Sequence, residues 1–165
     1  MTWYLIQSKP RQELVALENL SNQGYECYLP MMNIEKQVQK EIQVQKTPLF
    51  PRYLFINLEN DYFAKSWGPI RSTKGVSSLV RFGVEPAKIH DDLIGVIKFT
   101  ENQYEAKIEP LYKPGQILRI LNGPFKGFES IYKGMDGQMR VIVLFEFMQK
   151  SSTVTLSLDK VSLVK

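Results

Sequence analysis

One short segment constrains the fold of this chain more than any other. Residues 52–59 read RYLFINLE and alternate as a β-strand does, with successive side chains on opposite faces. Three aliphatic residues share one face and suit a core: Leu54, Ile56 and Leu58. Two aromatic residues and an amide share the other face: Tyr53, Phe55 and Asn57. The amide argues against full burial there, so these aromatic residues are either covered by a second layer or exposed as a protein-docking patch.

Strands and helices are mixed throughout the first hundred residues. Alternation predicts strands over 2–8, 25–30 and 76–83, and an exposed hairpin without a core face over 34–47. Helices are predicted over 11–23, 61–67 and 91–99, the last two capped by Asp61 and Asp91. This mixture predicts an α+β fold, an α/β sandwich of the ferredoxin-like kind.

Two of these helices have a recognisable apolar side. In helix 11–23 the predicted apolar side consists of Leu14, Leu17 and Leu20, and Gly24 is placed to end the helix. In helix 91–99 it consists of Leu93, Ile94, Val96 and Ile97.

The second half of the chain is expected to form a separate unit. Residues 65–88 hold five basic residues against one acidic residue, whereas 101–110 hold three acidic residues against one lysine. Residues 100–114 carry no sustained period and indicate a linker. Beyond them, β-rich runs over 115–123, 128–135, 140–148 and 153–164 predict a small barrel. We therefore expect domains over 1–100 and 113–165, joined by a linker over 101–112.

One run in the second half, RVIVLFEFMQK over 140–150, fits two structures. With a period of two, it presents the apolar strand face Val141, Val143, Phe145 and Phe147. With a period near 3.6, it presents the helical stripe Val141, Leu144, Phe145 and Met148. Periodicity alone often does not distinguish a helix from a strand in a short apolar run. The β-branched and aromatic residues of this run favour the strand.

The sequence offers little that points to catalysis. His90 has no cysteine or histidine cluster to join, so we expect no metal site and an ordinary surface histidine. Cys27, the single cysteine, is expected to be a small buried residue rather than a nucleophile. No P-loop, secretory signal or membrane-length apolar run is present. We therefore expect a cytoplasmic, monomeric binding protein without cofactor rather than an enzyme.

A basic segment suggests what is bound. Residues 65–83 combine Lys65, Trp67, Arg71 and Lys74 around a Gly-Pro turn. Positive charge beside an aromatic ring suits single-stranded nucleic acid, where bases stack and phosphates pair with basic side chains. A solvated surface face is the alternative explanation of the same charge.

Five segments in order add up to a family resemblance. They are WYLIQSKP (3–10), YLP (28–30), PLFPRYLF (48–55), RSTKGVSSLVRFG (71–83) and GQILRILNGPFKGF (115–128). The chain resembles the NusG superfamily of transcription elongation factors, and within it the RfaH-like specialised paralogs. The first four segments resemble the NusG N-terminal domain, and the last, with its Gly-Pro-Phe and second glycine, resembles a KOW motif. PLFPRYLF followed by RSTKGVSSLVRFG is the more specific pair.

The resemblance implies partners and site residues. Such factors bind the clamp helices of the largest RNA polymerase subunit and suppress pausing and termination. Carried over by position, the polymerase-binding residues would be Phe50, Tyr53, Phe55, Ile94 and Ile97, with Ser66 and Trp67 at the opposite polymerase pincer. Contacts to the non-template DNA strand would come from Lys9, Gln12, Arg71, Thr73 and Lys74.

The resemblance also implies two forms of the C-terminal domain. In RfaH-like proteins it folds either as an α-helical hairpin over the polymerase-binding patch or as a five-stranded barrel that recruits the small ribosomal subunit. By analogy, Tyr132, Arg140, Leu144, Phe145 and Met148 would form the contact between domains. The family prototype pairs an arginine here with an acidic residue, but at the acidic position this chain has Thr47.

Three functions are compatible with these sequence features and with the family resemblance. The first is an operon-specific antitermination factor of the RfaH type. The second is a general NusG, which would also bind the termination factor Rho. The third is a KOW-containing ribosomal or RNA-binding protein, which predicts RNA binding by the barrel and no affinity for polymerase.

Overall fold

The central sheet is antiparallel and has five strands. The computed structural model describes residues 2–58, 67–104, 127–128, 131 and 135–149. Within them the strand order is β2-β5-β1-β6, and β9 also pairs with β1. The bounds are β1 Trp3–Ser8, β2 Glu26–Tyr28, β5 Tyr53–Asn57, β6 Val76–Leu79 and β9 Lys88–Ile89. The predicted strand over 52–59 is therefore confirmed as β5, one of the two inner strands.

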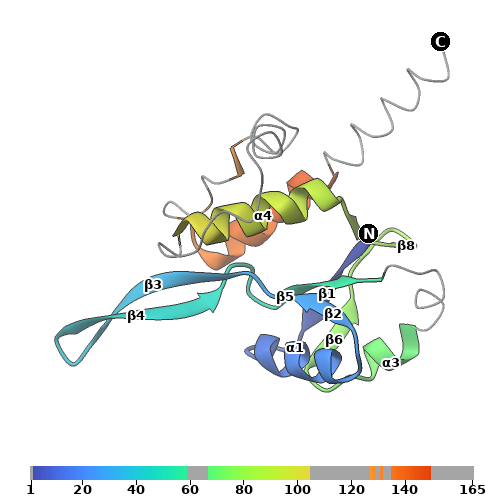
Figure 1. The fold of residues 1–165 in the computed structure, drawn as a ribbon, viewed down its shortest axis with the longest axis horizontal. Coiled ribbons are helices and arrows are strands. Elements are labelled where there is room, and N and C mark those ends of the chain that lie inside the picture. The colour runs from blue at the N-terminus through green and yellow to red at the C-terminus, as the bar shows by residue number, and fades with distance from the viewer. Residues whose placement is uncertain (1, 59–66, 105–126, 129–130, 132–134, 150–165) are drawn as a thin grey trace, which may run out of the picture.

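Helices cover both faces of this sheet (Figure 1). One face packs against α1, Glu13–Asn22, and α3, Trp67–Arg71. The other face packs against α4, Asp91–Tyr104, and a helix over 137–149, drawn in orange. Each face has its own core cluster, as expected for an α+β sandwich. The predicted fold class of the N-terminal part is confirmed.

The alternation of β5 explains why the sheet has two cores. Leu54, Ile56 and Leu58 are buried in the cluster under α1, as predicted. Phe55 points the other way and is buried in the cluster under α4. The register Leu5↔Phe55 and Ile6↔Leu54 gives β1 the same two-sided pattern.

The first helix differs from its prediction in start and in face. It begins at Glu13 rather than residue 11, because Arg11 has a positive φ of 60° and turns the chain out of β1. Its buried residues include Ala16 and Leu20, while Leu14 is 61% exposed. The reason is close packing, since a Cβ on Gly75 would lie 2.6 Å from the Ala16 nitrogen. Glycine at position 75 therefore lets the chain approach the helix backbone closely at Ala16, on the side that is buried. Gly24, with φ 93°, follows the helix as predicted.

The predicted hairpin projects from the body of the protein as an arm (Figure 1). It consists of β3, Met31–Val38, and β4, Glu41–Pro48, paired over their whole length. Ile42 and Val44 on the arm are exposed, so the expectation of a hairpin without a core is confirmed.

The segment over 76–83 forms two strands rather than one. After β6 the chain turns into β7, Arg81–Phe82, which pairs with β8, Glu85–Pro86, around Gly83 at φ 68°. The helix predicted over 61–67 lies outside the described residues apart from Trp67, the first residue of α3.

The last helix of the N-terminal part is longer than predicted. It starts after His90, whose Nδ1 accepts a hydrogen bond from the Asp92 amide, so His90 rather than Asp91 occupies the cap position. It continues to Tyr104, into the segment predicted as a linker from residue 101. Glu101 explains the extension, because its carboxylate accepts hydrogen bonds from the Tyr28 hydroxyl and the Met31 amide. The periodicity of a sequence does not predict such tertiary contacts.

The ambiguous run is helical, and the strand preference was wrong for this conformation. Asp136 caps the helix over 137–149, since its carboxylate accepts from the Met139 amide at 2.8 Å. Leu144 and Met148 are buried by tertiary packing, which overrides the strand propensity. The barrel runs predicted over 115–123 and 153–164 lie outside the described residues, and of the run over 128–135 only residues 128, 131 and 135 are described. None of the helices in the described part of the chain has the length and hydropathy needed to cross a membrane.

Candidate functional site

An aromatic cluster on the α4 side of the sheet forms the candidate site. Phe50 lies just before β5, Phe55 lies within it, and both are 0% exposed. Their ring centroids are 6.2 Å apart with the planes nearly perpendicular, a favourable edge arrangement. Tyr53 is partly buried against the same cluster. The structure thus brings together the three aromatic residues that the sequence singled out.

The α4 helix completes this cluster with aliphatic side chains. Ile94 and Ile97 are buried in it, as the apolar side of the predicted helix requires. We call Phe50, Tyr53, Phe55, Ile94 and Ile97 the docking patch. Its members come from the chain before β5, from β5 itself and from α4. Folding brings these segments together although they are separated in the sequence.

The docking patch is covered rather than exposed, which corrects one expectation. Asn57 was taken as a sign of incomplete burial, yet it is 6% exposed and its amide donates to the Glu26 carboxylate at 2.8 Å. This bond satisfies the amide nitrogen, whereas the Asn57 Oδ1 is buried without a hydrogen-bond partner among the described residues. Of the two alternatives for this face, a second layer of structure is therefore the one observed.

The helix over 137–149 supplies much of that layer, and we call it the covering helix. Leu144 and Met148 are buried within the same core cluster as the docking patch. Phe145 places its ring 5.5 Å from the Tyr53 ring and 5.9 Å from the Phe82 ring, both edge-on. The predicted helical stripe is the face that packs, and Val141 also lies partly buried against the cluster.

Part of the cover was missed from sequence. Phe128 is fully buried, with its ring 6.2 Å from Phe50 and 5.3 Å from Phe147. Ile131, three residues later, is buried in the same cluster. The spacing of three between these two residues was the available signal of a helical turn. It was outweighed by the β-rich composition of the run over 128–135.

Arg140 anchors the covering helix to the turn before β5. Arg140 is 7% exposed, and its Nε donates to the Leu49 carbonyl at 2.6 Å while Nη1 donates to the Met135 carbonyl at 2.6 Å. Hydrogen bonds from a charged donor are stronger than neutral ones. Arg140 therefore bonds to the main chain two residues after Thr47, the position where the family resemblance led us to look for an acid.

A glycine sets how closely the covering helix approaches. A Cβ on Gly137 would lie 2.6 Å from the Pro51 Cγ, so a larger residue would displace the first turn of the helix. The contact between the two halves of the chain is thus fixed at Gly137 and Arg140 and filled with apolar side chains beyond them.

Three predicted site residues do not belong to the docking patch as described. Ser66 and Tyr132 lie outside the described residues. Trp67 is half-buried on the opposite face of the sheet, where its ring meets the Tyr4 ring edge-on at 5.1 Å. Its indole contributes to the core beneath α3.

Basic side chains gather at one end of the sheet. Lys9, Arg71 and Lys74 are exposed and Gln12 is half-buried. The Lys9 amide donates to the Gly75 carbonyl at 2.8 Å, which joins their loops. Thr73 was expected to face DNA, but it is buried. Its hydroxyl donates to the Pro69 carbonyl at 2.7 Å and accepts from the side-chain amide of Gln23 at 2.7 Å. Its side chain holds α3 to the end of α1 instead of facing solvent.

His90 is a surface residue, as predicted, whereas Cys27 is half-buried rather than fully buried. His90 is exposed on the surface, beside Asp92. Burial, with a smaller contribution from Glu26, raises the pKa of the Cys27 thiol to about 12. Among the described residues, no group of three or more potential ligands is placed to hold a metal ion.

Comparison with known proteins identifies the family. A family model described as "Transcription termination factor nusG" matches residues 1–98. A "Transcription termination/antitermination protein NusG" from Helicobacter pylori strain J99 is 26% identical over 155 residues, covering 87% of each chain. The protein of that description from Rickettsia bellii is 25% identical over 170 residues, covering 96% of this chain and 88% of its own.

A solved structure, "Domain interaction in Thermotoga maritima NusG", is 21% identical, with a TM-score of 0.44 over 68% of each chain. The match of the family model extends from the first strand into α4 and so includes every member of the docking patch. On the strength of that match, the chain belongs to the NusG family of transcription factors.

Proposed function

We propose that this protein is a non-enzymatic transcription elongation factor that binds RNA polymerase through the docking patch. Relatives covering most of the chain are named as transcription termination/antitermination proteins, which supports a role in transcription. The observation that carries the proposal is the docking patch itself, an aromatic and aliphatic surface whose cover comes from a distant part of the chain. The clamp helices of the largest polymerase subunit are the proposed partner.

The cover implies that binding requires opening. Leu144 and Met148 are fully buried by the contact, and each such side chain contributes about 1.5–3 kcal/mol. Polymerase and the covering helix compete for one surface, so the apparent affinity falls with the fraction of closed molecules. The closed arrangement is therefore proposed to be autoinhibited.

The covered patch favours an operon-specific antiterminator of the RfaH type. In this proposal Lys9, Gln12, Arg71 and Lys74 contact the non-template DNA strand. The C-terminal KOW domain, proposed to span residues 113–165, would recruit the small ribosomal subunit after leaving the docking patch. The chain would act as a cytoplasmic monomer.

A general NusG role is the second candidate, and the comparisons favour it more directly. The relatives carry the NusG name, including an Escherichia coli protein that is 23% identical over 173 residues. A general NusG would also bind Rho. Capture of Rho by the isolated C-terminal domain would support the general role, whereas absence of capture under conditions where a known NusG binds would support the specialised one.

The central experiment compares polymerase capture by two variants of the intact chain. Tyr53→Ala, together with Phe55→Ala, removes the aromatic part of the docking patch and should abolish capture by RNA polymerase. Lys46→Ala, an exposed change on the hairpin arm, is the matched control and should capture as wild type does. Circular dichroism would verify that the double variant is folded. A KOW-type RNA-binding protein would show unchanged RNA binding in both variants and no polymerase capture in either.

A further inference from the structure

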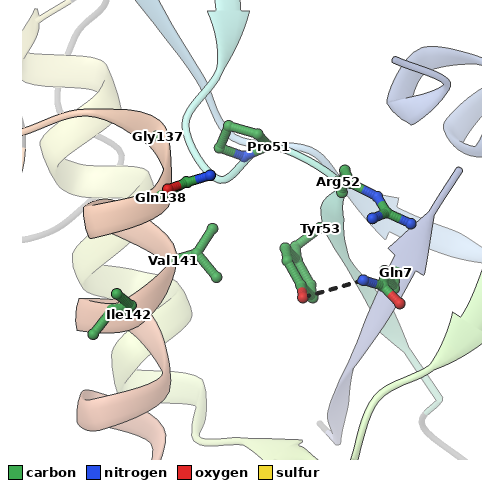
Figure 2. A pocket seen from close by; sticks show the side chains of 8 residues that line it. All are labelled: Gln7, Pro51, Arg52, Tyr53, Gly137, Gln138, Val141 and Ile142. Carbon is green, nitrogen blue, oxygen red and sulfur yellow. Dashed lines mark hydrogen bonds between the residues drawn. The ribbon is translucent and has the colours of Figure 1, made fainter. Parts of the chain in front are cut away.

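A pocket lies where the covering helix meets the end of β5 (Figure 2). Its volume is about 480 Å³, within the range of pockets that hold small molecules. One wall comes from the sheet and carries Gln7, Arg52 and Tyr53. The other wall comes from the first turns of the helix over 137–149 and carries Gln138, Val141 and Ile142.

Arg52 gives the pocket a fixed cation. Its φ is 73°, a strained value for a residue other than glycine, and such strain concentrates at functional positions. Its Nε donates to the Ser8 carbonyl at 3.2 Å, and its own carbonyl accepts from the Ser8 amide at 2.7 Å. Within the described part of the chain, its terminal guanidinium nitrogens have no hydrogen-bond partner. A guanidinium held this way presents a free fork of donors, which suits a phosphate or carboxylate.

The remaining walls suit a flat, hydrogen-bonding ring. The Gln7 amide is oriented by two bonds, since it donates to the Tyr53 hydroxyl at 3.3 Å and accepts from Ser78 at 3.2 Å. Figure 2 shows Tyr53 between Gln7 and the helix, with Val141 directed toward it. Glutamine amides match the hydrogen-bonding edges of nucleobases, and aromatic and aliphatic side chains contact their faces.

We propose that this pocket binds a mononucleotide-sized ligand, with its phosphate on Arg52 and its ring over Tyr53, where the ring has Gln7 on one side and Val141 on the other. Because one wall belongs to the covering helix, the complete site exists only while the helix is docked. The ligand therefore favours the closed arrangement, by about tenfold when its concentration is ten times its dissociation constant. This regulatory consequence rests on the proposed function, whereas the binding itself does not.

The test is a titration of the isotope-labelled full chain with thymidine 5′-monophosphate, followed by NMR. We expect saturable shifts around Arg52 and Val141 with a Kd of about 1 mM or tighter. Thymidine, which lacks the anion, and inorganic phosphate, which lacks the ring, should each bind at least about tenfold more weakly. A 5′-phosphorylated thymidine pentanucleotide distinguishes the sources when binding is read from the shifts of Val141, which lies in the pocket and not among the proposed DNA-contacting residues. Tighter binding of the strand at this position assigns the site to nucleic acid rather than to a free nucleotide.

Two variants make the assignment specific. Arg52→Gln should weaken binding at least about tenfold, and Lys36→Gln, at an exposed position of the hairpin arm outside the pocket, should not. Ile142→Glu adds a negative charge at a half-exposed helix position and should weaken binding without altering the strand wall. Binding no tighter than that of inorganic phosphate, or unchanged in Arg52→Gln, would overturn the site.

Polymerase capture separates this inference from the proposed function. With the site occupied by thymidine 5′-monophosphate, capture should fall in wild type and stay constant in Arg52→Gln. Failure of the NMR titration leaves the proposed function untouched. Saturable binding that does not alter capture keeps the pocket and overturns its link to opening.

Discussion

Arg140 is the residue on which docking of the covering helix depends most. Replacing it with methionine keeps the bulk but removes the bonds to the Leu49 and Met135 carbonyls. One buried and one partly buried acceptor lose their donor, and we expect the closed arrangement to weaken by about 1–3 kcal/mol. Chemical shifts of the helix, or polymerase capture, would report the larger open fraction. Met139→Ala, at an exposed position of the same turn, is the control and should leave both unchanged.

Thr47 leads to the opposite expectation. The described bonds of Arg140 on the N-terminal side go to a main-chain carbonyl, which no substitution at position 47 removes. Thr47→Ala should therefore change docking by less than about 0.5 kcal/mol, as surface substitutions commonly do. If this variant opened the chain as far as Arg140→Met, the anchoring role of the Leu49 carbonyl would be wrong.

Cys27 supports a prediction about pH. Its pKa in the folded state is about 12, against an ordinary value of 9.0, because burial disfavours the thiolate. The folded state holds its proton more tightly, so this contribution to stability is complete below pH 9.0 and is lost as pH rises toward 12. Labelling of the native chain by a thiol reagent at pH 8 should be slower than labelling of the unfolded chain, because the half-buried thiol stays protonated. Cys27→Ala should remove part of the alkaline loss of stability. Rapid labelling without unfolding would contradict the burial.

At the level of single residues, the sequence predicted which side of the sheet a side chain lies on better than it predicted what packs over that side chain. The alternation of RYLFINLE correctly placed Leu54 and Phe55 on opposite sides of the sheet. It did not predict what lies over Phe55, because that layer comes from residues some ninety positions later in the chain, as the bond between Leu49 and Arg140 illustrates. Leu14 failed for a related reason, since the close approach of Gly75 decides which face of α1 turns inward.

The helix over 137–149 shows how tertiary contact selects among secondary structures. Its β-branched and aromatic residues favour a strand, but the Asp136 cap and the burial of Leu144 and Met148 stabilise a helix. The periodicity of the run is compatible with both structures, and packing against the docking patch selects the helix. A sequence with two packings separated by a few kcal/mol can change structure when its partner surface is removed.

This element can be tested by backbone NMR. In the intact chain, residues 141–148 should show helical shifts and slow amide exchange. In the isolated segment 113–165, which lacks the docking patch, the same residues should show β-type shifts. The chemical shift of each residue is its own control, because the sequence is unchanged. β-type shifts in both forms would contradict docking of the helix in solution.

At the scale of the whole molecule, the two proposed binding surfaces are separate. The docking patch lies between the sheet and its covering helix, whereas Lys9, Arg71 and Lys74 are exposed at the end of the sheet in the same closed arrangement. Polymerase binding should therefore require opening, and DNA binding should not. This separation depends on the fold, and the sequences of the aromatic strand and of the basic segment do not predict it.

The separation gives a final prediction. Leu144→Glu places a charge in the buried cover, which should undock the helix and raise polymerase capture. The affinity of the same variant for a single-stranded DNA oligonucleotide should stay within about twofold of wild type, since phosphate contacts from the three basic residues remain. Lys74→Ala is the reciprocal control, because it should weaken DNA binding and lower its salt dependence by about 0.7 in the logarithmic slope while leaving polymerase capture unchanged. A large change in DNA affinity in Leu144→Glu would show that the covering helix also governs the basic end of the sheet.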